Sequence, residues 1–332
     1  MEAGPGHPEQ TTGYDCQLGE NFMNHGFVSI VIPCYRSGES LPELVERLLK
    51  VSAELCRRFE IILVDDRSPD ATWETLKSLK AKHGEPLKII RLLKNAGQHN
   101  ALLCGMQLAT GDVVITMDDD LQNPPEEIPK LLAAVAGGYD LAIGAYEQKY
   151  HSAARNGGGG LVDGVLRTIF KLPPDFQLTS FRAVRREVVE NACRMGGVFP
   201  YVTAMLLSHA GNQVNVLVQH APRKFGASNY NLRRSLSLAA NLLLNYSSYP
   251  LYLIGALCGF AFLLAFAFGG FVLVRTFMNG ITVPGWASTV IIVSFLNALT
   301  LLSLVIFGLY LSRLNLQISQ SKPRFTISEQ HQ

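Results

Sequence analysis

The chain has 332 residues, of which 48% are hydrophobic and 17% are charged, and its formal net charge is +2. This length allows one large domain with an accessory element, and no nucleic-acid partner is expected. The six cysteines show no CxxC pair and no histidine-linked metal spacing, which indicates a reducing compartment rather than a disulfide framework.

The first 25 residues are predicted to form a disordered N-terminal tail. They are rich in Gly, Pro, Gln, Asn and Thr, and they contain no apolar segment of the kind that a signal peptide requires. The predicted cytoplasmic catalytic domain therefore covers residues 26–230.

From Phe27 onward, apolar runs alternate with segments of helical periodicity. The predicted strands are 27–35, 59–66, 87–94 and 112–120, and the predicted helices between them are 41–55, 69–84 and 97–111. Each strand is a continuous apolar run, which is typical of strands covered on both faces. The alternation predicts a doubly wound, mostly parallel α/β sheet, which binds ligands at the carboxyl ends of its strands.

One acidic cluster, Asp118–Asp120, ends the fourth predicted strand. If the strand geometry continues, Asp118 and Asp120 share one side while Asp119 faces away. Together with the side-chain amide oxygen of Gln122, these two carboxylates offer hard oxygen ligands suited to Mg²⁺ or Mn²⁺. Such an ion would neutralise a diphosphate leaving group.

A helix start is the structural alternative for this segment. Asn123, followed by two prolines and two glutamates, has the composition of a helix N-cap. We accept that interpretation for Asn123, but it leaves Asp118 and Asp120 unexplained.

Two more loops are expected at the same edge of the sheet. Asp65 and Asp66 follow the second predicted strand, and a carboxylate there can accept from a base N–H or a ribose hydroxyl. Ser68 and Asp70 are interpreted as caps of the next helix. In the loop after the third strand stand Asn95 and Gly97, and the glycine is explained equally well as a turn residue.

The C-terminal third of the chain lacks charged residues over two long stretches. No Asp, Glu, Lys, Arg or His lies between Arg234 and Arg275 or between Arg275 and Arg313. Within them, the apolar runs 251–274 and 288–311 each exceed the roughly 20 residues that cross a bilayer as a helix. They predict a transmembrane hairpin over 250–312.

Basic residues flank this predicted hairpin at its two outer ends, and the turn between its spans is nearly uncharged. By the positive-inside rule, the catalytic domain and both termini are expected in the cytoplasm, with the protein multi-pass in the inner membrane. An interfacial amphipathic helix is predicted over 231–249, with its arginines near the lipid headgroups. The cytoplasmic tail, 313–332, ends in a polar stretch that is expected to be mobile.

The motifs together resemble the family 2 glycosyltransferases of GT-A fold. The segments "VSIVIPCY", "VDDRSPDAT", "LLKNAGQHNAL" and "MDDDLQNPPE" occur in that family's order. More narrowly, the chain is similar to the polyisoprenyl-phosphate glycosyltransferases, a subgroup that includes bacterial aminoarabinose and prophage-type glucose transferases and dolichol-phosphate mannose synthase. "LTSFRAVRREVV" and "HAPRKFGASNYNLRRSL" match this subgroup as well.

The resemblance implies roles for particular residues. The metal ligands that it implies are Asp118, Asp120 and Gln122. Its catalytic residues are Asp118, Asp120 and Arg223. Its nucleotide-binding residues are Pro33, Tyr35, Asp65, Asp66, Asn95, Gly97 and Asp119. Its acceptor-phosphate residues are Ser180 and Arg182, and its diphosphate loop carries Arg223, Ser228 and Tyr230.

Two observations qualify this transfer of roles. Without the resemblance, Arg182, Arg185 and Arg186 would be interpreted as an ordinary solvated helix face. Several relatives carry a basic residue where this chain has Tyr146, so a phosphate contact there is an open question.

The implied reaction is an inverting, metal-dependent transfer of a sugar from a nucleotide-sugar to a polyisoprenyl phosphate such as undecaprenyl phosphate. UDP is favoured over GDP by likeness to the bacterial members, and a homotetramer is one assembly that the resemblance allows. A phosphomonoester has a second pKa near ~6 and needs no general base, so His99, His209 and His220 receive no catalytic role.

Three alternatives stand beside this function. One is a GDP-mannose enzyme like dolichol-phosphate mannose synthase. A processive polysaccharide synthase would carry a Q-x-x-R-W segment and more spans, which this chain lacks. The third is a catalytically silent nucleotide-binding membrane scaffold, against which the intact Asp118 and Asp120 argue.

Overall fold

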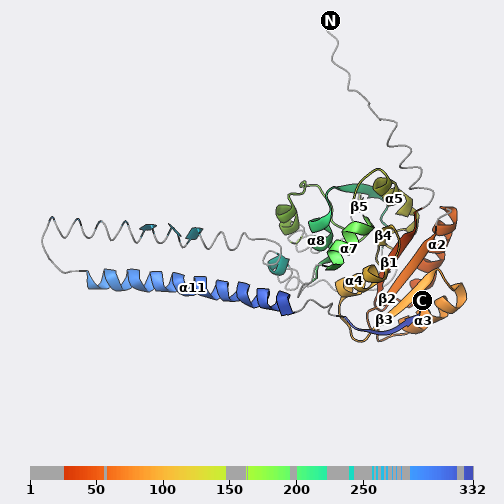
Figure 1. Cartoon of the computed structure of the whole chain (residues 1–332), viewed down its shortest axis with the longest axis horizontal. Coiled ribbons are helices and arrows are strands. Elements are labelled where there is room, and N and C mark those ends of the chain that lie inside the picture. The colour runs from red at the N-terminus through yellow and green to blue at the C-terminus, as the bar shows by residue number, and fades with distance from the viewer. Residues whose placement is uncertain are drawn as a thin grey trace, which may run out of the picture.

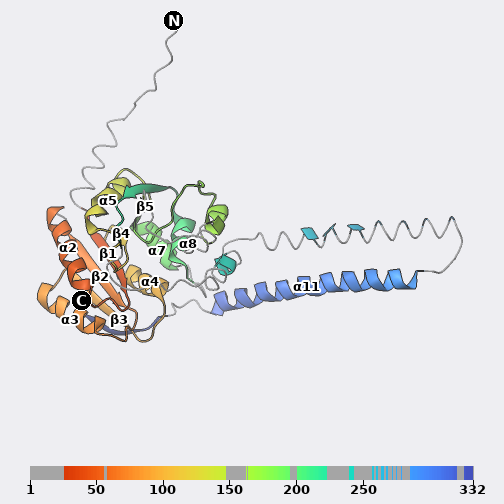
Figure 2. The same cartoon turned by 180° about the vertical axis from the view of Figure 1, so that it is seen from behind.

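The computed structural model describes residues 26–55, 58–146, 162, 164–194, 200–222, 239–242, 285–319 and 325–331, with scattered residues between 256 and 278. The N-terminal tail and most of the predicted interfacial helix and first span lie outside this part. Figure 1 shows the whole chain, and Figure 2 shows it from behind.

The described part of the chain forms an eight-stranded sheet with the order β7-β5-β6-β4-β1-β2-β3-β8. Its strands are β1 (Val28–Cys34), β2 (Phe59–Asp65), β3 (Leu87–Leu92), β4 (Val113–Thr116), β5 (Leu141–Tyr146), β6 (Arg182–Arg185), β7 (Gln213–Val218) and β8 (Ile327–His331). Strands β1 to β4 run parallel to one another, as do β5 and β7. Because β6 and β8 run antiparallel to their neighbours, the sheet is mixed and mostly parallel, as predicted.

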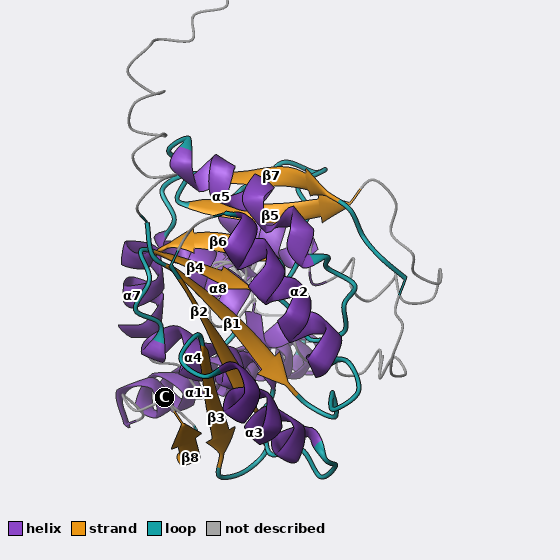
Figure 3. Cartoon of the chain, turned by 90° about the vertical axis from the view of Figure 1, so that its right-hand side faces the viewer, coloured by secondary structure: helices purple, strands orange, loops and turns teal. Residues whose placement is uncertain are grey.

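Helices cover both faces of this sheet (Figure 3). The helical elements are α2 (Leu41–Glu54), α3 (Thr72–His83), α4 (Gln98–Leu108), the 3₁₀ helix η1 (Pro125–Glu127), α5 (Ile128–Ala136), α7 (Arg186–Arg194), α8 (Val202–His209) and α11 (Trp286–Ser319). One core cluster includes α2, α3 and α5, and the other includes α4, α7 and α8. Alternate residues of β1 supply both clusters: Ile30 and Ile32 face the first, and Val31 faces the second.

Local sequence features explain the packing face of α2 and the end of α3. In α2, buried apolar residues recur at helical spacing from Leu41 to Val51, which fixes the face that packs on the sheet. Helix α3 ends at His83, and the following Gly84 has a φ of 69°, in the left-handed region that glycine adopts without a Cβ clash. These bounds lie within three residues of those predicted from the sequence.

The strand order reverses next to β1. The chain passes from β1 to β2 and β3 on one side, and then returns to place β4 on the other side of β1. At such a switch point the connecting loops diverge and leave a crevice outside the carboxyl ends of the two strands. The topology therefore places a ligand site at the ends of β1 and β4.

The end of the chain corrects one prediction. Residues 327–331 were expected within a mobile polar tail, but they form β8 along the free edge of β3. The Leu93 N–H donates to the Thr326 carbonyl at 2.7 Å, which extends this pairing. An edge strand presents unpaired N–H and C=O groups, and the tail satisfies those of β3.

Helix α11 extends away from the sheet domain (Figures 1 and 2). The structure leaves several of its side chains undescribed. Within the described residues, no helix combines the length and the apolar character needed to cross a membrane.

Candidate active site

A cleft of about 1130 Å³ opens at the carboxyl ends of β1 and β4. Its walls come from the loops that follow β1, β2, β3 and β4. Among the predicted site residues, its lining includes Pro33, Tyr35, Asp66, Asn95, Gly97 and Asp118–Asp120. The cleft exceeds the size of a typical drug-sized pocket, and it brings together residues from four separate motifs.

Three non-glycine residues adopt a left-handed backbone conformation at this edge. Arg36, Arg67 and Leu121 have φ values of 57°, 58° and 59°, and they follow β1, β2 and β4 respectively. This conformation costs roughly 1–2 kcal/mol for a residue with a side chain, and such residues cluster at functional sites. No sequence signal reveals them, because arginine and leucine are not turn residues.

Asp118–Asp120 lie together on the cleft wall. The prediction that Asp119 faces away was wrong, because β4 ends at Thr116 and the strand alternation does not reach the aspartates. Instead, Asp119 Oδ2 accepts a hydrogen bond from the Tyr35 N–H at 3.2 Å. This bond joins the loop after β4 to the loop after β1.

The electrostatics of this cluster favour a bound cation. Burial raises the pKa of Asp119 to about 7, and the nearby charges of Asp118 and Asp120 add to that rise against hydrogen bonds from Ser37 and Tyr35. A carboxyl whose ionisation is opposed by its neighbours is stabilised by added positive charge.

Asp118 is held from two sides. The Gln98 side-chain amide donates to Asp118 Oδ1 at 2.7 Å, and the Ser180 hydroxyl donates to Oδ2 at 2.5 Å. The carbonyl of Ser180 accepts from the Thr116 hydroxyl at 2.8 Å. Gln98 was not predicted as a site residue, although its place beside Gly97 in the same motif was the available signal.

The other two candidate metal ligands, Asp120 and Gln122, take part in hydrogen bonds with backbone groups. Asp120 Oδ1 accepts from the Gln122 backbone N–H at 3.1 Å. The Gln122 carbonyl accepts from the Ala221 N–H at 2.9 Å. These bonds fix the backbone after Leu121 and connect it to the segment that follows β7.

Asp66 positions the loop after β3. Its two carboxylate oxygens accept from the backbone N–H groups of Ala96 and Gly97 at 2.7 and 2.8 Å. Burial raises the pKa of Asp66, whereas these two bonds favour its charged form. Gly97 has a φ of 90° and directly precedes α4, so its backbone conformation explains the glycine.

Asp65 lies behind the cleft wall and is fully buried. Its Oδ1 accepts from the Ser68 N–H at 2.9 Å, and its Oδ2 pairs with the Arg91 Nε at 3.1 Å. Asp65 therefore contacts the loop after β2 and one residue of β3.

The acceptor-phosphate candidates lie beside this cleft rather than in its lining. Arg182 begins β6 and is only 3% exposed, so the alternative of a solvated helix face was wrong for it. Its guanidinium donates to the Thr203 hydroxyl at 3.2 Å, and burial lowers its pKa. The diphosphate-loop residues Arg223, Ser228 and Tyr230 lie outside the described part.

A half-buried histidine, His99, lies close enough to Arg182 to be affected by its charge. Burial, and to a smaller extent the charge of Arg182, lower the pKa of His99 to about 4, which keeps the ring neutral at neutral pH. The ring packs on Tyr201 with centroids 4.6 Å apart.

The cap assigned to Asn123 was wrong. Its side-chain oxygen accepts from the Tyr146 hydroxyl at 2.5 Å, while Pro124 precedes η1 and no side chain caps that helix. The tyrosine ring also packs on His220, with centroids 4.2 Å apart. In this chain Tyr146 thus connects β5 to the loop after β4.

The caps assigned to Ser68 and Asp70 were correct only in part. Asp70 Oδ1 accepts from the backbone N–H and the hydroxyl of Thr72, the first residue of α3. The Ser68 hydroxyl, in contrast, accepts from the Arg36 N–H at 3.1 Å. Ser68 therefore joins two cleft loops instead of capping the helix.

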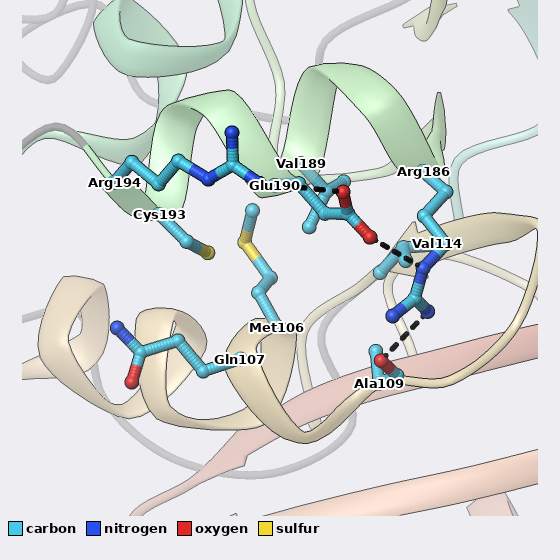
Figure 4. A pocket seen from close by; sticks show the side chains of 9 residues that line it. All are labelled: Met106, Gln107, Ala109, Val114, Arg186, Val189, Glu190, Cys193 and Arg194. Carbon is cyan, nitrogen blue, oxygen red and sulfur yellow. Dashed lines mark hydrogen bonds and ion pairs between the residues drawn. The ribbon is translucent and has the colours of Figure 1, made fainter.

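A second cavity of about 160 Å³ lies between α4 and α7 (Figure 4). Arg186 is one of its polar lining residues, and it donates to the Ala109 carbonyl at 2.9 Å and to Glu190 at 2.8 Å. These bonds serve the packing of the two helices. This cavity contains none of the predicted site residues.

The donor set of the larger cleft fits a divalent ion by its chemistry. Asp118 and Asp120 line the cleft beside Asp119, and carboxylate oxygens are the hard ligands that Mg²⁺ and Mn²⁺ prefer. Among the described residues, no group of three or more His, Cys, Asp or Glu side chains is already arranged around a metal position.

The fold is shared with solved glycosyltransferase structures. Glucosyl-3-phosphoglycerate synthase from Mycobacterium tuberculosis, in complex with Mn²⁺, UDP-glucose and phosphoglyceric acid, aligns with a TM-score of 0.51. The alignment covers 72% of this chain and 83% of that one at 16% identity. This likeness concerns the fold alone, and it defines an α/β, GT-A-like architecture for the described domain.

The sequence comparisons define the family. The family model "Glycosyl transferase family 2" matches residues 29–191. The undecaprenyl-phosphate 4-deoxy-4-formamido-L-arabinose transferase of Pseudomonas aeruginosa (strain LESB58) is 36% identical over 90% of this chain and 89% of its own length. The protein of the same description from Klebsiella pneumoniae (strain ATCC 700721) is 32% identical over 90% and 92%. The chain belongs to glycosyltransferase family 2 and is a glycosyltransferase.

Proposed function

We propose that the protein transfers a sugar from a nucleotide-sugar to undecaprenyl phosphate. The observation that carries this proposal is the convergence of four motif loops on one acidic cleft at the switch point of the sheet. It is supported by the relatives described above, whose printed names specify undecaprenyl phosphate as the acceptor.

The nucleotide-sugar would occupy the large cleft. Tyr35 follows β1 and is 45% exposed at the rim, where its ring can contact a base. Asp118–Asp120 line the same cleft and, with a bound cation, would compensate the charge of the diphosphate. A cleft of about 1130 Å³ accommodates both parts of such a donor.

Asp118 and Asp120, with Gln122, would hold Mg²⁺ or Mn²⁺. When bound, the ion neutralises charge on the diphosphate leaving group. Gln98 and Ser180 fix the orientation of the Asp118 carboxylate by hydrogen bonds to its two oxygens. Fixed carboxylates need no reorganisation during the reaction, which is the condition for electrostatic stabilisation of a transition state.

The reaction exchanges one bond for another at the anomeric carbon. An oxygen of the lipid phosphate attacks that carbon, and the bond to the nucleoside diphosphate breaks with its electron pair leaving on the diphosphate. Attack from the opposite face inverts the configuration. The phosphate needs no general base, because its second pKa is near ~6.

The acceptor phosphate would approach past Ser180, whose hydroxyl lies 2.5 Å from Asp118. Arg182 is buried, and its Nε donates to the Ser180 carbonyl at 3.4 Å. Its positive charge therefore acts on the acceptor site from beneath the surface. Arg223, Ser228 and Tyr230 are proposed, from the resemblance, to close over the diphosphate.

A membrane hairpin would hold the cleft close to its lipid acceptor. The support for two spans comes from the sequence, where the uncharged runs 251–274 and 288–311 each exceed the roughly 20 apolar residues that cross a bilayer core as a helix. The basic residues outside these runs favour a cytoplasmic catalytic domain.

The test is reconstitution of the full-length protein in liposomes that contain undecaprenyl phosphate. Radiolabelled UDP- and GDP-sugars are added one at a time with MnCl₂, and label is measured in the organic phase. We expect one or a few UDP-sugars to label the lipid and EDTA to abolish the labelling. No labelled lipid with any donor, or equal labelling in excess EDTA, contradicts the proposal.

A further inference from the structure

The C-terminal strand β8 contacts a group of residues that lead to the large cleft. Glu329 in β8 accepts a hydrogen bond from the indole N–H of Trp73 at 3.2 Å. The ring of His331, two residues further along the strand, lies 6.1 Å from the Trp73 ring. Trp73 is only 2% exposed, so Glu329 satisfies a buried donor that would otherwise be costly.

Trp73 in turn orients Arg91. The Arg91 guanidinium lies over the indole ring, with its central carbon 5.5 Å from the ring centroid. A planar guanidinium stacks on an aromatic face, which restricts its rotation. This contact directs the Arg91 Nε to Asp65 Oδ2, at 3.1 Å.

Arg91 then acts on the loops of the cleft. Besides Asp65, its guanidinium reaches the Ser68 carbonyl at 3.4 Å. Ser68 donates its N–H to Asp65 and accepts the Arg36 N–H on its hydroxyl. Arg36 is one of the left-handed residues of the cleft and directly follows Tyr35. A continuous set of contacts therefore connects β8 to the loop after β1.

We propose that Trp73 and Arg91 are positioning residues of the nucleotide site and that β8 keeps them in place. The inference rests on the proposed function, because it takes the loops after β1 and β2 as the nucleotide site. Asp65 is fully buried, and its Oδ2 lies 3.1 Å from the Arg91 Nε. If the contacts of the Arg91 guanidinium to Asp65 and to the Ser68 carbonyl are lost, the buried Asp65 carboxylate has no positive charge beside it from Arg91. The loop that holds Arg36 is then less restrained.

The experiment measures nucleotide binding by the full-length protein in detergent. UDP and GDP are titrated calorimetrically in the presence of MnCl₂, and the thermal midpoint of each variant is recorded. We expect Arg91→Lys to weaken UDP binding about tenfold and Glu329→Ala about threefold. Trp73→Phe keeps the aromatic face but loses the indole N–H, so it should match Glu329→Ala.

Ser328→Ala is the matched control, because Ser328 lies next to Glu329 in the same strand and is exposed. It should bind UDP as the wild type does. In turnover assays with the active donor, Glu329→Ala should raise the KM for the donor and leave kcat and the KM for the lipid acceptor unchanged.

Two results overturn the inference. One is a lower thermal midpoint in Arg91→Lys and Glu329→Ala with unchanged UDP affinity, which would make the role purely structural. The other is an equal loss of affinity in Ser328→Ala. A wild-type protein that binds neither UDP nor GDP would contradict the proposed function and this inference together, whereas unchanged variants contradict the inference alone.

Discussion

Asp118 and Asp120 belong to one short turn, yet the structure supports them in different ways. Side chains from α4 and from the segment before β6 hold Asp118, whereas Asp120 is held by the backbone of its own turn. The two carboxylates therefore respond to different substitutions, and each residue gives a separate prediction.

Asp120→Asn should abolish sugar transfer while the protein still accumulates in membranes. The amide is nearly isosteric but carries no charge, so it weakens a hard-cation site and removes compensation for the diphosphate. We expect a loss of at least about 100-fold in kcat/KM, measured as labelled lipid. Asp112→Asn is the control, because Asp112 bonds to the Phe27 N–H before the start of β4. Turnover by Asp120→Asn at the wild-type level would remove the metal assignment.

Gln98→Ala should raise the concentration of Mn²⁺ needed for half-maximal activity. The substitution deletes the 2.7 Å hydrogen bond that fixes the Asp118 carboxylate, and loss of a bond to a charged group costs about 1.5–3 kcal/mol. Titration of activity with MnCl₂ measures the shift, which we expect to be about tenfold or more. Gln107→Ala, at the other end of α4, should leave the titration unchanged. An unshifted curve for Gln98→Ala would show that Asp118 needs no such support.

At the scale of elements, α4 connects the core to the site. Gly97 and Gln98 at its start lie in the cleft, and Gly105 near its end packs on the sheet. A Cβ on Gly105 would lie 2.3 Å from Val31 Cγ1 and 3.2 Å from Val64 Cγ2. The absence of a side chain at Gly105 therefore sets how closely α4 approaches β1 and β2.

Gly105→Ala should lower the thermal midpoint and raise the donor KM in the same protein. Overpacking of this kind costs about 1–3 kcal/mol, and it shifts a helix whose first residues line the cleft. Gly164→Ala serves as the control, because a Cβ there meets nothing within 4 Å. A variant as stable as the wild type would show that α4 moves freely on the sheet.

Local patterns predicted the elements around the cleft more accurately than the contacts inside it. The apolar runs placed β1, β2 and β3 to within two residues, because burial on both faces leaves a local signature. They extended β4 to residue 120, whereas the strand ends at Thr116 and the aspartates belong to the loop that follows it. They also missed β8, whose polar sequence becomes a strand only against the edge of β3.

At the scale of the whole molecule, β8 connects the end of α11 to the catalytic sheet. Only residues 320–326 separate the two elements, and eight steps of extended chain reach at most about 28 Å. Ile327 pairs with Leu92 at the carboxyl end of β3, on the edge of the sheet that carries the cleft. The chain thus limits how far the cleft can lie from the end of α11.

Insertion of ten Gly and Ser residues after Ser321 should lower transfer to undecaprenyl phosphate in liposomes several-fold. A longer connection reduces the effective concentration of the cleft at the membrane surface. UDP binding should stay at the wild-type value, because the contacts of Glu329 are preserved. The control replaces residues 320–324 by Gly and Ser without changing the length. Undiminished transfer by the longer variant would show that the length of this connection does not restrict the distance between the cleft and the membrane.

By itself, the sequence determined the family, the alternation of strands and helices, and the acidic clusters at the strand ends, because periodicity and motif order are written along neighbouring residues. Tertiary structure alone decided that Gln98 and Ser180 hold Asp118, that Tyr146 bonds to Asn123, and that the last strand pairs with β3. The partners in these contacts are separated by 20 to 62 residues in the side-chain pairs. The physical reason is that a hydrogen-bond partner is selected by distance and direction in space, and the packing of remote segments sets both.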